Sequence, residues 1–497
     1  MADKINPLLS ALAAALILAA CAAPEFKQPQ IDVPAAFKES VNPQTASAQT
    51  AADGTSWQQA KAAEAQPRGE WWLAFNDPTL NQLIDQATQA NANLAVAAAR
   101  VKQARAIAGI AEADRIPQIG VSAGATRERL SPLSLGLPQG SIVPPANVYQ
   151  ANLTASYEVD LFGRVSSNVA AARSDEAASE AQYRSVLLSL QADVAQTYFR
   201  LRETDAELDT LNETVKLREE SVRVNQRRYD LGDLGEFDLS RAKTELATSR
   251  AEAVGLQQQR VTNEHALAVL LGKPASSYNA EHNPLKEGVA FPGIPAGLPS
   301  ALLERRPDIV IAQKNMEAAN ARIGVARAAM FPAINLNAGA GGTANTFPDV
   351  FQWPNRSWLL GALLNMPLLD GGRNKANVER SKAALEEAVA SYRQSTLAAF
   401  AEVEDNLAGL RILAGQSEQI DAAVVSAQRS TQLAQQLYDA GRSSYLDLLD
   451  AQRNLATVQR NAVQLRGTRA VTTVALIRSL GGGWDASAGA SVAVAQQ

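Results

Sequence analysis

Apolar residues recur along the chain with two different periods, which predicts long helices separated by short strands. In one stretch an apolar residue occupies every seventh position: Leu187, Val194, Leu201, Leu208, Val215, Val222 and Tyr229. A heptad pattern held over so many turns is typical of a coiled coil. We therefore expect one helix from about Val165 to Tyr229, on the order of 100 Å long at the standard rise per residue.

Four short segments instead alternate apolar and polar residues, which predicts strands with two unlike faces. In residues 149–160, for example, Leu153 and Tyr157 share the apolar positions, whereas Thr154 belongs to the polar set. We expect strands at about residues 117–127, 149–160, 333–342 and 357–368. Their length suits a tilted transmembrane β-strand. Half-buried strands of a soluble sandwich are the alternative, and the loops rich in Pro, Gly and Asn between paired strands favour the membrane.

The second half of the chain repeats the first half at a constant offset of 209 residues. Leu161-Phe162-Gly163-Arg164 matches Asp370-Gly371-Gly372-Arg373, and Tyr229-Asp230-Leu231-Gly232 matches Tyr438-Asp439-Ala440-Gly441. Because a repeat of this kind decides the architecture, each half is expected to hold a helix, two strands and a coiled-coil hairpin. The hairpin turns fall near Gly232 and Gly441.

Four strands cannot close a β-barrel by themselves, since about eight is the practical minimum. An open sheet edge does not survive in lipid, because its backbone groups have no hydrogen-bond partners there. The chain must therefore combine its strands with those of other copies. Two copies would give eight strands and three would give twelve, and the need to line a tube with many helices favours three.

The composition excludes several classes of function. The net charge of −5 gives no basic face for nucleic acid. The chain has two histidines, His265 and His282, and one cysteine, Cys21, so a His/Cys metal site, a Cys–His dyad and an internal disulfide are not expected. We expect no enzymatic activity, and we discount Glu264 beside His265 as an exposed pair on a coiled coil.

The N-terminus resembles the signal of a bacterial lipoprotein. An apolar run from Leu8 to Ala20 is too short to span a bilayer and fits a signal peptide. Leu18-Ala19-Ala20-Cys21 resembles a lipobox. An ordinary signal peptide that contains a cysteine is the alternative. In bacterial lipoproteins Cys21 would carry several acyl chains, enough for a stable anchor, and Ala22 after it implies sorting to the outer membrane.

Three further motifs carry a resemblance to a known family. They are Leu303-Glu304-Arg305-Arg306-Pro307-Asp308, the corner Asp160-Leu161-Phe162-Gly163-Arg164, and Tyr438-Asp439-Ala440-Gly441 followed by Leu446-Asp447-Leu448-Leu449-Asp450-Ala451-Gln452. Together they resemble the outer membrane factors, the TolC/OprM-type channel lipoproteins of tripartite efflux systems driven by resistance-nodulation-division (RND) transporters. We read Asp308 as helix-start chemistry and Gly163 and Gly371-Gly372 as sharp turns between strand and helix.

The resemblance implies an all-α coiled-coil barrel joined to a transmembrane β-barrel in a homotrimer. Four strands per chain would give a 12-stranded barrel in the outer membrane and a 12-helix periplasmic tunnel. The expected partners are a periplasmic membrane-fusion adaptor, an inner-membrane RND transporter and outer-membrane lipid, with no cofactor besides the lipid on Cys21. The exit duct of a type I protein-secretion system and a lipid-anchored periplasmic scaffold are the alternatives.

The expected organisation of the chain follows from the repeat and the resemblance. It comprises a signal peptide at 1–20, a lipid-anchored tether and belt at 21–78, a first repeat at 79–271, an equatorial belt insert at 272–300, a second repeat at 301–484 and a disordered tail at 485–497.

The same resemblance assigns a gate at the second hairpin turn. Leu446, Asp450 and Arg453 match constriction positions of OprM-like channels, and Asp447 shares a helix face with Asp450. Tyr438, Asp447 and the first-repeat Asp238 match the latch of TolC-like channels, in which a tyrosine bonds to an acid on the neighbouring hairpin. The family pattern has an arginine at Ser443, and Arg442 beside it is a candidate substitute. Solvation of helix ends is the alternative role for these charges.

Overall fold

The computed structural model describes residues 70–286 and 305–482, with short stretches at 26, 29, 33–34, 36–39 and 292. The chain divides into two compact units. Unit 1 comprises Met1–Gln30, Arg100–Glu180 and Ile311–Arg393, and unit 2 comprises Ile31–Ala99, Ala181–Val310 and Gln394–Gln497. Both units draw on both sequence repeats. Cys21 and the tail from residue 485 lie outside the described residues.

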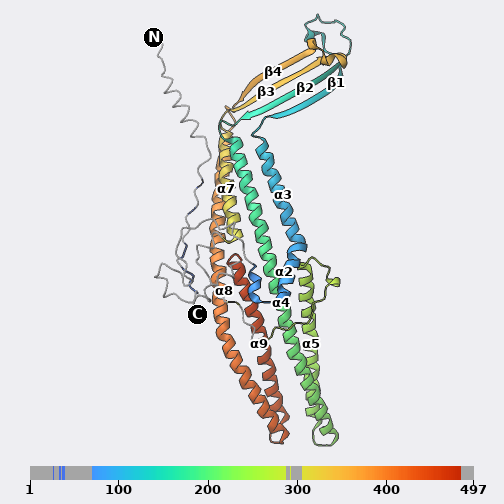
Figure 1. Ribbon diagram of the computed structural model, residues 1–497, viewed down its shortest axis with the longest axis vertical. Helices are drawn as coiled ribbons and strands as arrows, with labels where there is room; N and C mark the ends of the chain where they lie inside the picture. The colour runs from blue at the N-terminus through green and yellow to red at the C-terminus, as the bar shows by residue number, and fades with distance from the viewer. Residues whose placement is uncertain are drawn as a thin grey trace, which may run out of the picture. The chain divides into compact units, whose positions relative to one another are not determined.

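The described part of the chain alternates long helices with paired strands (Figure 1). The helices are α2 (Pro78–Ala90), α3 (Ala92–Ala113), α4 (Arg164–Asp230), α5 (Glu236–Leu270), α7 (Pro307–Ala328), α8 (Arg373–Asp439) and α9 (Tyr445–Ser479), and the strands are β1 (Gln118–Glu128), β2 (Ala146–Val159), β3 (Ala333–Ala344) and β4 (Arg356–Asn365). Helices α4 and α8 have 67 residues each, which confirms the predicted rods. None of the described helices is long and apolar enough to cross a membrane.

The four strands form one antiparallel sheet in the order β1-β2-β3-β4. Leu153 lies opposite Val121 and Ala340, and Thr154 lies opposite Gly120 and Gly339. Since residues paired across a sheet share a face, the sheet has the expected apolar and polar faces. Strand β4 is the exception, because Leu359 and Leu363 share the polar face.

Two strand boundaries differ from the prediction. Strand β2 begins at Ala146 rather than 149, and β4 ends at Asn365 rather than 368. Pro367 explains the second difference, because proline has no backbone N–H to donate to the ladder.

Each long helix starts at a capped corner directly after its strand. The Asp160 carboxylate accepts hydrogen bonds from the backbone N–H groups of Val165 and Ser166, at 2.9 and 2.7 Å. Asp370 does the same for Gly372 and Asn374, both at 2.9 Å. The glycines at these corners have positive φ: Gly163 74°, Gly371 65° and Gly372 87°. This confirms the expected glycine-permitted turns.

The first repeat was expected to begin with one helix, and this prediction was wrong, because that helix is divided into α2 and α3. Asn91 is extended (φ −70°, ψ 124°) between α2 and α3. Its side chain accepts a hydrogen bond from the N–H of Leu94 at 3.1 Å and donates one to the carbonyl of Leu270 at 2.9 Å. A buried asparagine therefore caps α3 and ties it to α5.

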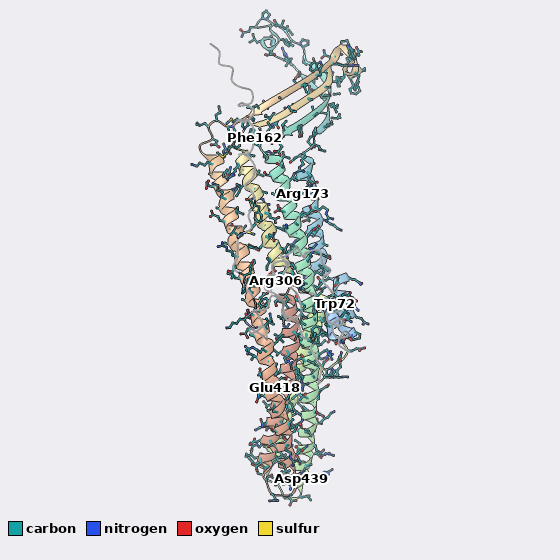
Figure 2. All side chains as sticks on the ribbon, turned by 60° about the vertical axis from the view of Figure 1, so that its left-hand side comes forward. Trp72, Phe162, Arg173, Arg306, Glu418 and Asp439 are labelled. Carbon is teal, nitrogen blue, oxygen red and sulfur yellow. The ribbon has the colours of Figure 1, made fainter. Side chains whose placement is uncertain are left out.

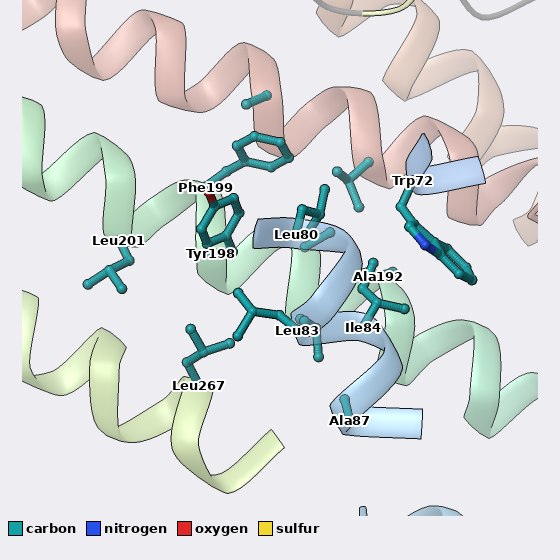
Figure 3. Packing of buried hydrophobic residues seen from close by; sticks show 14 of the residues in the cluster. Trp72, Leu80, Leu83, Ile84, Ala87, Ala192, Tyr198, Phe199, Leu201 and Leu267 are labelled. Carbon is teal, nitrogen blue, oxygen red and sulfur yellow. The ribbon is translucent and has the colours of Figure 1, made fainter. Parts of the chain in front are cut away.

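Unit 2 has an apolar core around α2, where the N-terminal segment meets α4, α5 and α9 (Figure 3). Trp71, Leu80, Ile84 and Phe199 are buried there. Asp77 caps α2 by accepting a hydrogen bond from the N–H of Thr79 at 3.0 Å. The core fixes α4 against its neighbours.

Two charged residues have structural roles in unit 2. Arg306, 8% exposed, pairs with Asp308 and Glu402, each at 2.7 Å. Asp308 also accepts from the N–H of Ile309 at 3.0 Å, which confirms its expected role at the helix start. Glu264 was expected to be exposed, but it is 8% exposed and accepts from the N–H of Ala280 at 2.7 Å. The segment after α5 folds back on it and removes it from solvent.

The heptad pattern of α4 is buried only over part of its length. Val194, Leu201 and Leu208 are at most 6% exposed, whereas Tyr229 at the hairpin end is 40% exposed. The core of unit 2 therefore covers the middle of the seam, and the hairpin end is held by other contacts.

Candidate functional site

Both hairpins end in turns of the same construction (Figures 1 and 2; Asp439 at the end of α8 is labelled in Figure 2). Gly232 and Gly441 have φ of 80° and 67°. The N–H of Asp233 donates to the carbonyl of Arg228, and that of Arg442 to the carbonyl of Leu437, both at 2.8 Å. The 209-residue repeat is thus reproduced in the backbone of the two turns.

Asp447 is held at the start of α9 by a reciprocal cap. Its carboxylate accepts from the N–H of Ser444 at 2.9 Å, and its own N–H donates to the Ser444 hydroxyl at 3.2 Å. These hydrogen bonds from Ser444 lower the pKa of the Asp447 carboxyl below its ordinary value. A carboxylate that remains charged is thereby fixed on an exposed surface, next to Leu446, which is 40% exposed.

Arg453 joins the two hairpins of the chain. Its guanidinium donates from Nε to Glu245 on α5 at 3.0 Å, and it lies 3.7 Å from the Asp450 carboxylate. The hydrogen bond from Arg453 lowers the pKa of the Glu245 carboxyl. Sequence reasoning singled out Arg453 and Asp450, but it missed Glu245.

Tyr438 also joins the hairpins, though through a different residue from the one expected. It is 9% exposed, and its hydroxyl donates to the side-chain carbonyl of Asn225 on α4 at 3.1 Å. The proposed partner Asp238 lies half-exposed in the first turn of α5. The Tyr438 ring also packs against the ring of Tyr445, with the two centroids 5.9 Å apart.

Further polar contacts continue along the same pair of hairpins. Arg218, only 3% exposed, donates to Gln452 at 2.7 Å. Arg460 pairs with Glu207 at 2.9 Å and with Glu252 at 3.3 Å. With Arg453–Glu245 and Tyr438–Asn225, these contacts form what we call the hairpin ladder. Sequence reasoning missed its first-repeat members, since nothing local marks a partner more than 200 residues away.

The candidate substitute for the missing latch arginine makes no ion pair among the described residues. Arg442 is exposed, and the described residues include no ion pair to it. The hydroxyl oxygen of the half-buried Ser443 is itself buried and has no hydrogen-bond partner among the described residues. Of the two arginines near the turn, Arg453 makes the bridge. The described residues contain no cluster of three or more potential metal ligands.

Comparisons with known proteins match nearly the whole chain. A family model described as outer membrane efflux protein matches residues 83–273 and 298–482. The chain is 32% identical to the probable outer membrane lipoprotein SilC of Salmonella typhimurium over 96% of this chain and 98% of SilC. It is 33% identical to the toluene efflux pump outer membrane protein TtgC of Pseudomonas putida over 96% of both chains.

A solved structure extends the likeness to the fold. The open state of the MtrE outer membrane channel of Neisseria gonorrhoeae aligns with a TM-score of 0.77 and 28% identity, over 93% of this chain and 98% of that one. The coiled-coil hairpins, the four-stranded sheet and the duplicated turns thus occur together in a channel of the outer membrane. This chain belongs to the outer membrane efflux protein family.

Proposed function

We propose that this outer-membrane channel is the passive exit duct of a tripartite efflux pump driven by an RND transporter. Three copies supply twelve strands to one barrel, which removes the open edges at β1 and β4. The six hairpin turns of such a trimer would face a periplasmic membrane-fusion adaptor. The observation that carries the proposal is the pair of equivalent turns in each chain, because it offers an adaptor six similar contact points.

The channel itself carries out no reaction in this proposal. Energy and selection of cargo belong to the inner-membrane partner, and the duct conducts small organic molecules that have already been chosen. Affinity purification of the tagged channel from cross-linked cells tests the assignment. An adaptor and an RND transporter should be recovered together, whereas recovery of an ABC-type transporter would favour type I protein secretion and overturn the proposal.

We propose that the second hairpin turn closes the duct at rest. Leu446, Asp447 and Asp450 share the exposed side of the first turns of α9, and Arg453 follows one turn later. Three copies of the two acids bring six carboxylates around one axis, where their mutual repulsion needs compensation. The Arg453–Glu245 and Tyr438–Asn225 contacts hold α8 and α9 in place against that repulsion.

Ion selectivity tests the gate. A ring of carboxylates attracts cations, so replacing Asp447 and Asp450 with alanine should reduce the cation preference of single channels in planar bilayers. Next to the first turn, Phe237 and Arg241 occupy the positions equivalent to Leu446 and Asp450, and Phe237→Ala/Arg241→Ala is the control. Unchanged conductance and selectivity in Asp447→Ala/Asp450→Ala would exclude the acids from the constriction.

We infer that Cys21 carries the lipid anchor, on the strength of the lipobox and of the lipoprotein character stated for SilC. Radiolabelled palmitate should enter the wild type and should be absent from Cys21→Ser. The variant should still form trimers, since the barrel inserts through its own apolar belt. Label that persists in Cys21→Ser would refute the anchor.

A further inference from the structure

The apolar face of the sheet ends in a belt of aromatic and basic residues. Figure 1 shows the β1–β2 and β3–β4 connections at the end of the sheet opposite to its junctions with the helices. Near that end Trp358 and Trp353 are 81% and 76% exposed, and Phe347 is 59% exposed. Aromatic girdles of this kind mark the level of lipid headgroups on transmembrane barrels. With the helices in the periplasm, this girdle lies at the outer leaflet.

Arg356 shares the lipid-facing side of the sheet. It pairs with Gly342, which pairs with Ala151 on β2. Trp358 pairs with Ala340, two residues along the same strand, so Arg356 and Trp358 project from the same face. The arginine therefore lies one step beyond the apolar band, at its outer boundary.

The guanidinium of Arg356 is held in place without being neutralised. It stacks on the ring of Trp353, with its central carbon 3.7 Å from the ring centroid. Stacking of this kind uses the face of the guanidinium and leaves its in-plane N–H donors available. The acid of the same loop, Asp349, is occupied by hydrogen bonds with Thr346 and Gln352. Among the described residues, no carboxylate forms an ion pair with Arg356.

A second arginine lies near the same end of the other edge strand, four residues further towards the β1–β2 connection by the register of the sheet. Arg127 lies opposite Asn147, at an odd position of β1 like Val121 and Ala123, so it also belongs to the lipid-facing side. It is exposed. In the closed barrel β4 of one copy pairs with β1 of the next, about 5 Å away. Arg356 and the Arg127 of a second copy then project from adjacent strands at the same rim.

Two exposed guanidiniums beside an aromatic belt fit one class of ligand, a phosphate on a lipid headgroup. Arginine binds phosphate through two parallel hydrogen bonds, and the indole rings accommodate the adjoining sugar and acyl boundary. We propose that Arg356, stacked on Trp353, and Arg127 of the neighbouring copy bind the phosphate of a phosphorylated glycolipid in the outer leaflet. Each trimer has three such sites, one at every junction between copies. The site lies outside the duct and is independent of the gate.

Lipid binding by the purified trimer tests this proposal. Native mass spectrometry should show the wild type retaining bis-phosphorylated lipid A and retaining the dephosphorylated lipid much less. Arg127→Gln/Arg356→Gln should weaken binding of the phosphorylated lipid by about tenfold or more and leave binding of the dephosphorylated lipid unchanged. Arg380→Gln, an exposed arginine of α8, is the matched control and should bind like the wild type.

Two results would overturn the proposal. One is equal retention of the two lipids by the wild type, which would leave only apolar contact with the barrel. The other is unchanged retention in the double variant. If the double variant yields no trimer, Trp353→Ala keeps both charges but removes the stack, and it should still lower retention of the phosphorylated lipid relative to Arg380→Gln. Wild-type retention in Trp353→Ala would then count against the site.

Discussion

Glu203 is a carboxyl group confined by the close approach of two helices. A Cβ placed on Gly467 of α9 would meet its Oε2 atom, so only glycine leaves room for the glutamate side chain there. Burial raises the pKa of Glu203 to about 7, and the neighbouring Glu207 adds to the rise, whereas Arg200 opposes it. Folding therefore favours the protonated form of Glu203.

The raised pKa of Glu203 predicts that the stability of the folded protein depends on pH. Since its folded pKa lies above its ordinary value of 4.5, stability is lost as the pH rises from about 4.5 through 7 and stays low above that. Glu203→Gln removes the titration and should stabilise the protein at pH 8 by on the order of 2 kcal/mol per chain, with little effect at pH 5. Thermal unfolding of the trimer at both pH values measures this. Exposed Glu213→Gln is the control, and equal pH dependence in Glu203→Gln and wild type would contradict the prediction.

The contact between Arg453 and Glu245 leads us to expect that single substitutions at either residue weaken closure of the channel. Arg453→Gln and Glu245→Gln each break one bridge between the hairpins, so both should raise the resting conductance and sensitise cells to large antibiotics such as vancomycin. Because the two residues act through one contact, the double variant should resemble either single variant. Additive effects, or a wild-type conductance in Glu245→Gln, would show that Arg453 acts through another partner.

Because the bridge between Arg453 and Glu245 is an ion pair, we expect it to depend on pH. Arg453 lowers the pKa of Glu245, so the bridge is present above the ordinary carboxyl pKa and is lost as the pH falls through the lower folded value. Resting conductance of the wild type should therefore stay low at every pH above 4.5, the ordinary pKa of a glutamate, and rise only in more acidic solution. Glu245→Gln should lack that rise.

At the scale of elements, the alternation of apolar and polar residues in the sequence determines which face of the sheet each residue of a strand lies on. Leu153 and Thr154 lie on opposite faces of β2. An arginine on the lipid side of a barrel at mid-membrane costs roughly 2–4 kcal/mol, and one in the lumen costs much less. Leu153→Arg should lower the yield of outer-membrane trimer, and Thr154→Arg should not. The reverse order in membrane fractions would place the apolar face in the lumen.

Long elements could be predicted from the sequence because their signals are local and repeated. The heptads of α4, the alternation in β2 and the 209-residue offset each involve many residues. The break at Asn91 could not be foreseen in the same way, because it depends on a hydrogen bond to Leu270, far away in sequence. Only part of the candidate gate could be predicted, because its contacts also join residues far apart in sequence. Arg453 and Tyr438 stand in recognisable motifs, but Glu245 and Asn225 become visible only once α4 and α5 lie beside α8 and α9.

At the scale of the whole molecule, a trimer places six hairpins in a ring, in which first-repeat and second-repeat hairpins alternate. One kind of junction therefore joins the two hairpins of the same chain, and a second kind joins hairpins of neighbouring copies. The hairpin ladder stabilises the junction within the chain. Four of its contacts are Glu245–Arg453, Glu207–Arg460, Arg218–Gln452 and Asn225–Tyr438.

The sequence repeat shows which residues at the junction between copies are equivalent to the residues of the hairpin ladder. Shifting each of these four contacts by 209 residues gives Asn454 with Thr244, Gln416 with Ala251, Ala427 with Lys243, and Ala434 with Tyr229. None of these pairs joins opposite charges, and three of them have an alanine on one side, which offers no side-chain hydrogen-bonding group. Equivalent backbones thus carry a polar ladder within the chain and weak contacts between chains.

This asymmetry predicts that the duct opens by separating copies at the tip, with the two hairpins of each chain moving together. Two matched pairs of cysteines test it in a Cys21→Ser background, which leaves no other thiol. Glu207→Cys/Arg460→Cys can be joined within a chain by a short thiol cross-linker, and Ala251→Cys/Gln416→Cys can be joined between copies at the equivalent height. Cross-linking between copies should abolish opening events in planar bilayers and block export in cells. Cross-linking within the chain should leave both near their uncross-linked levels, because the ladder already holds those helices together. If the link within the chain blocks opening and the link between copies does not, the hairpins of one chain must part, and the ladder is then the element that breaks.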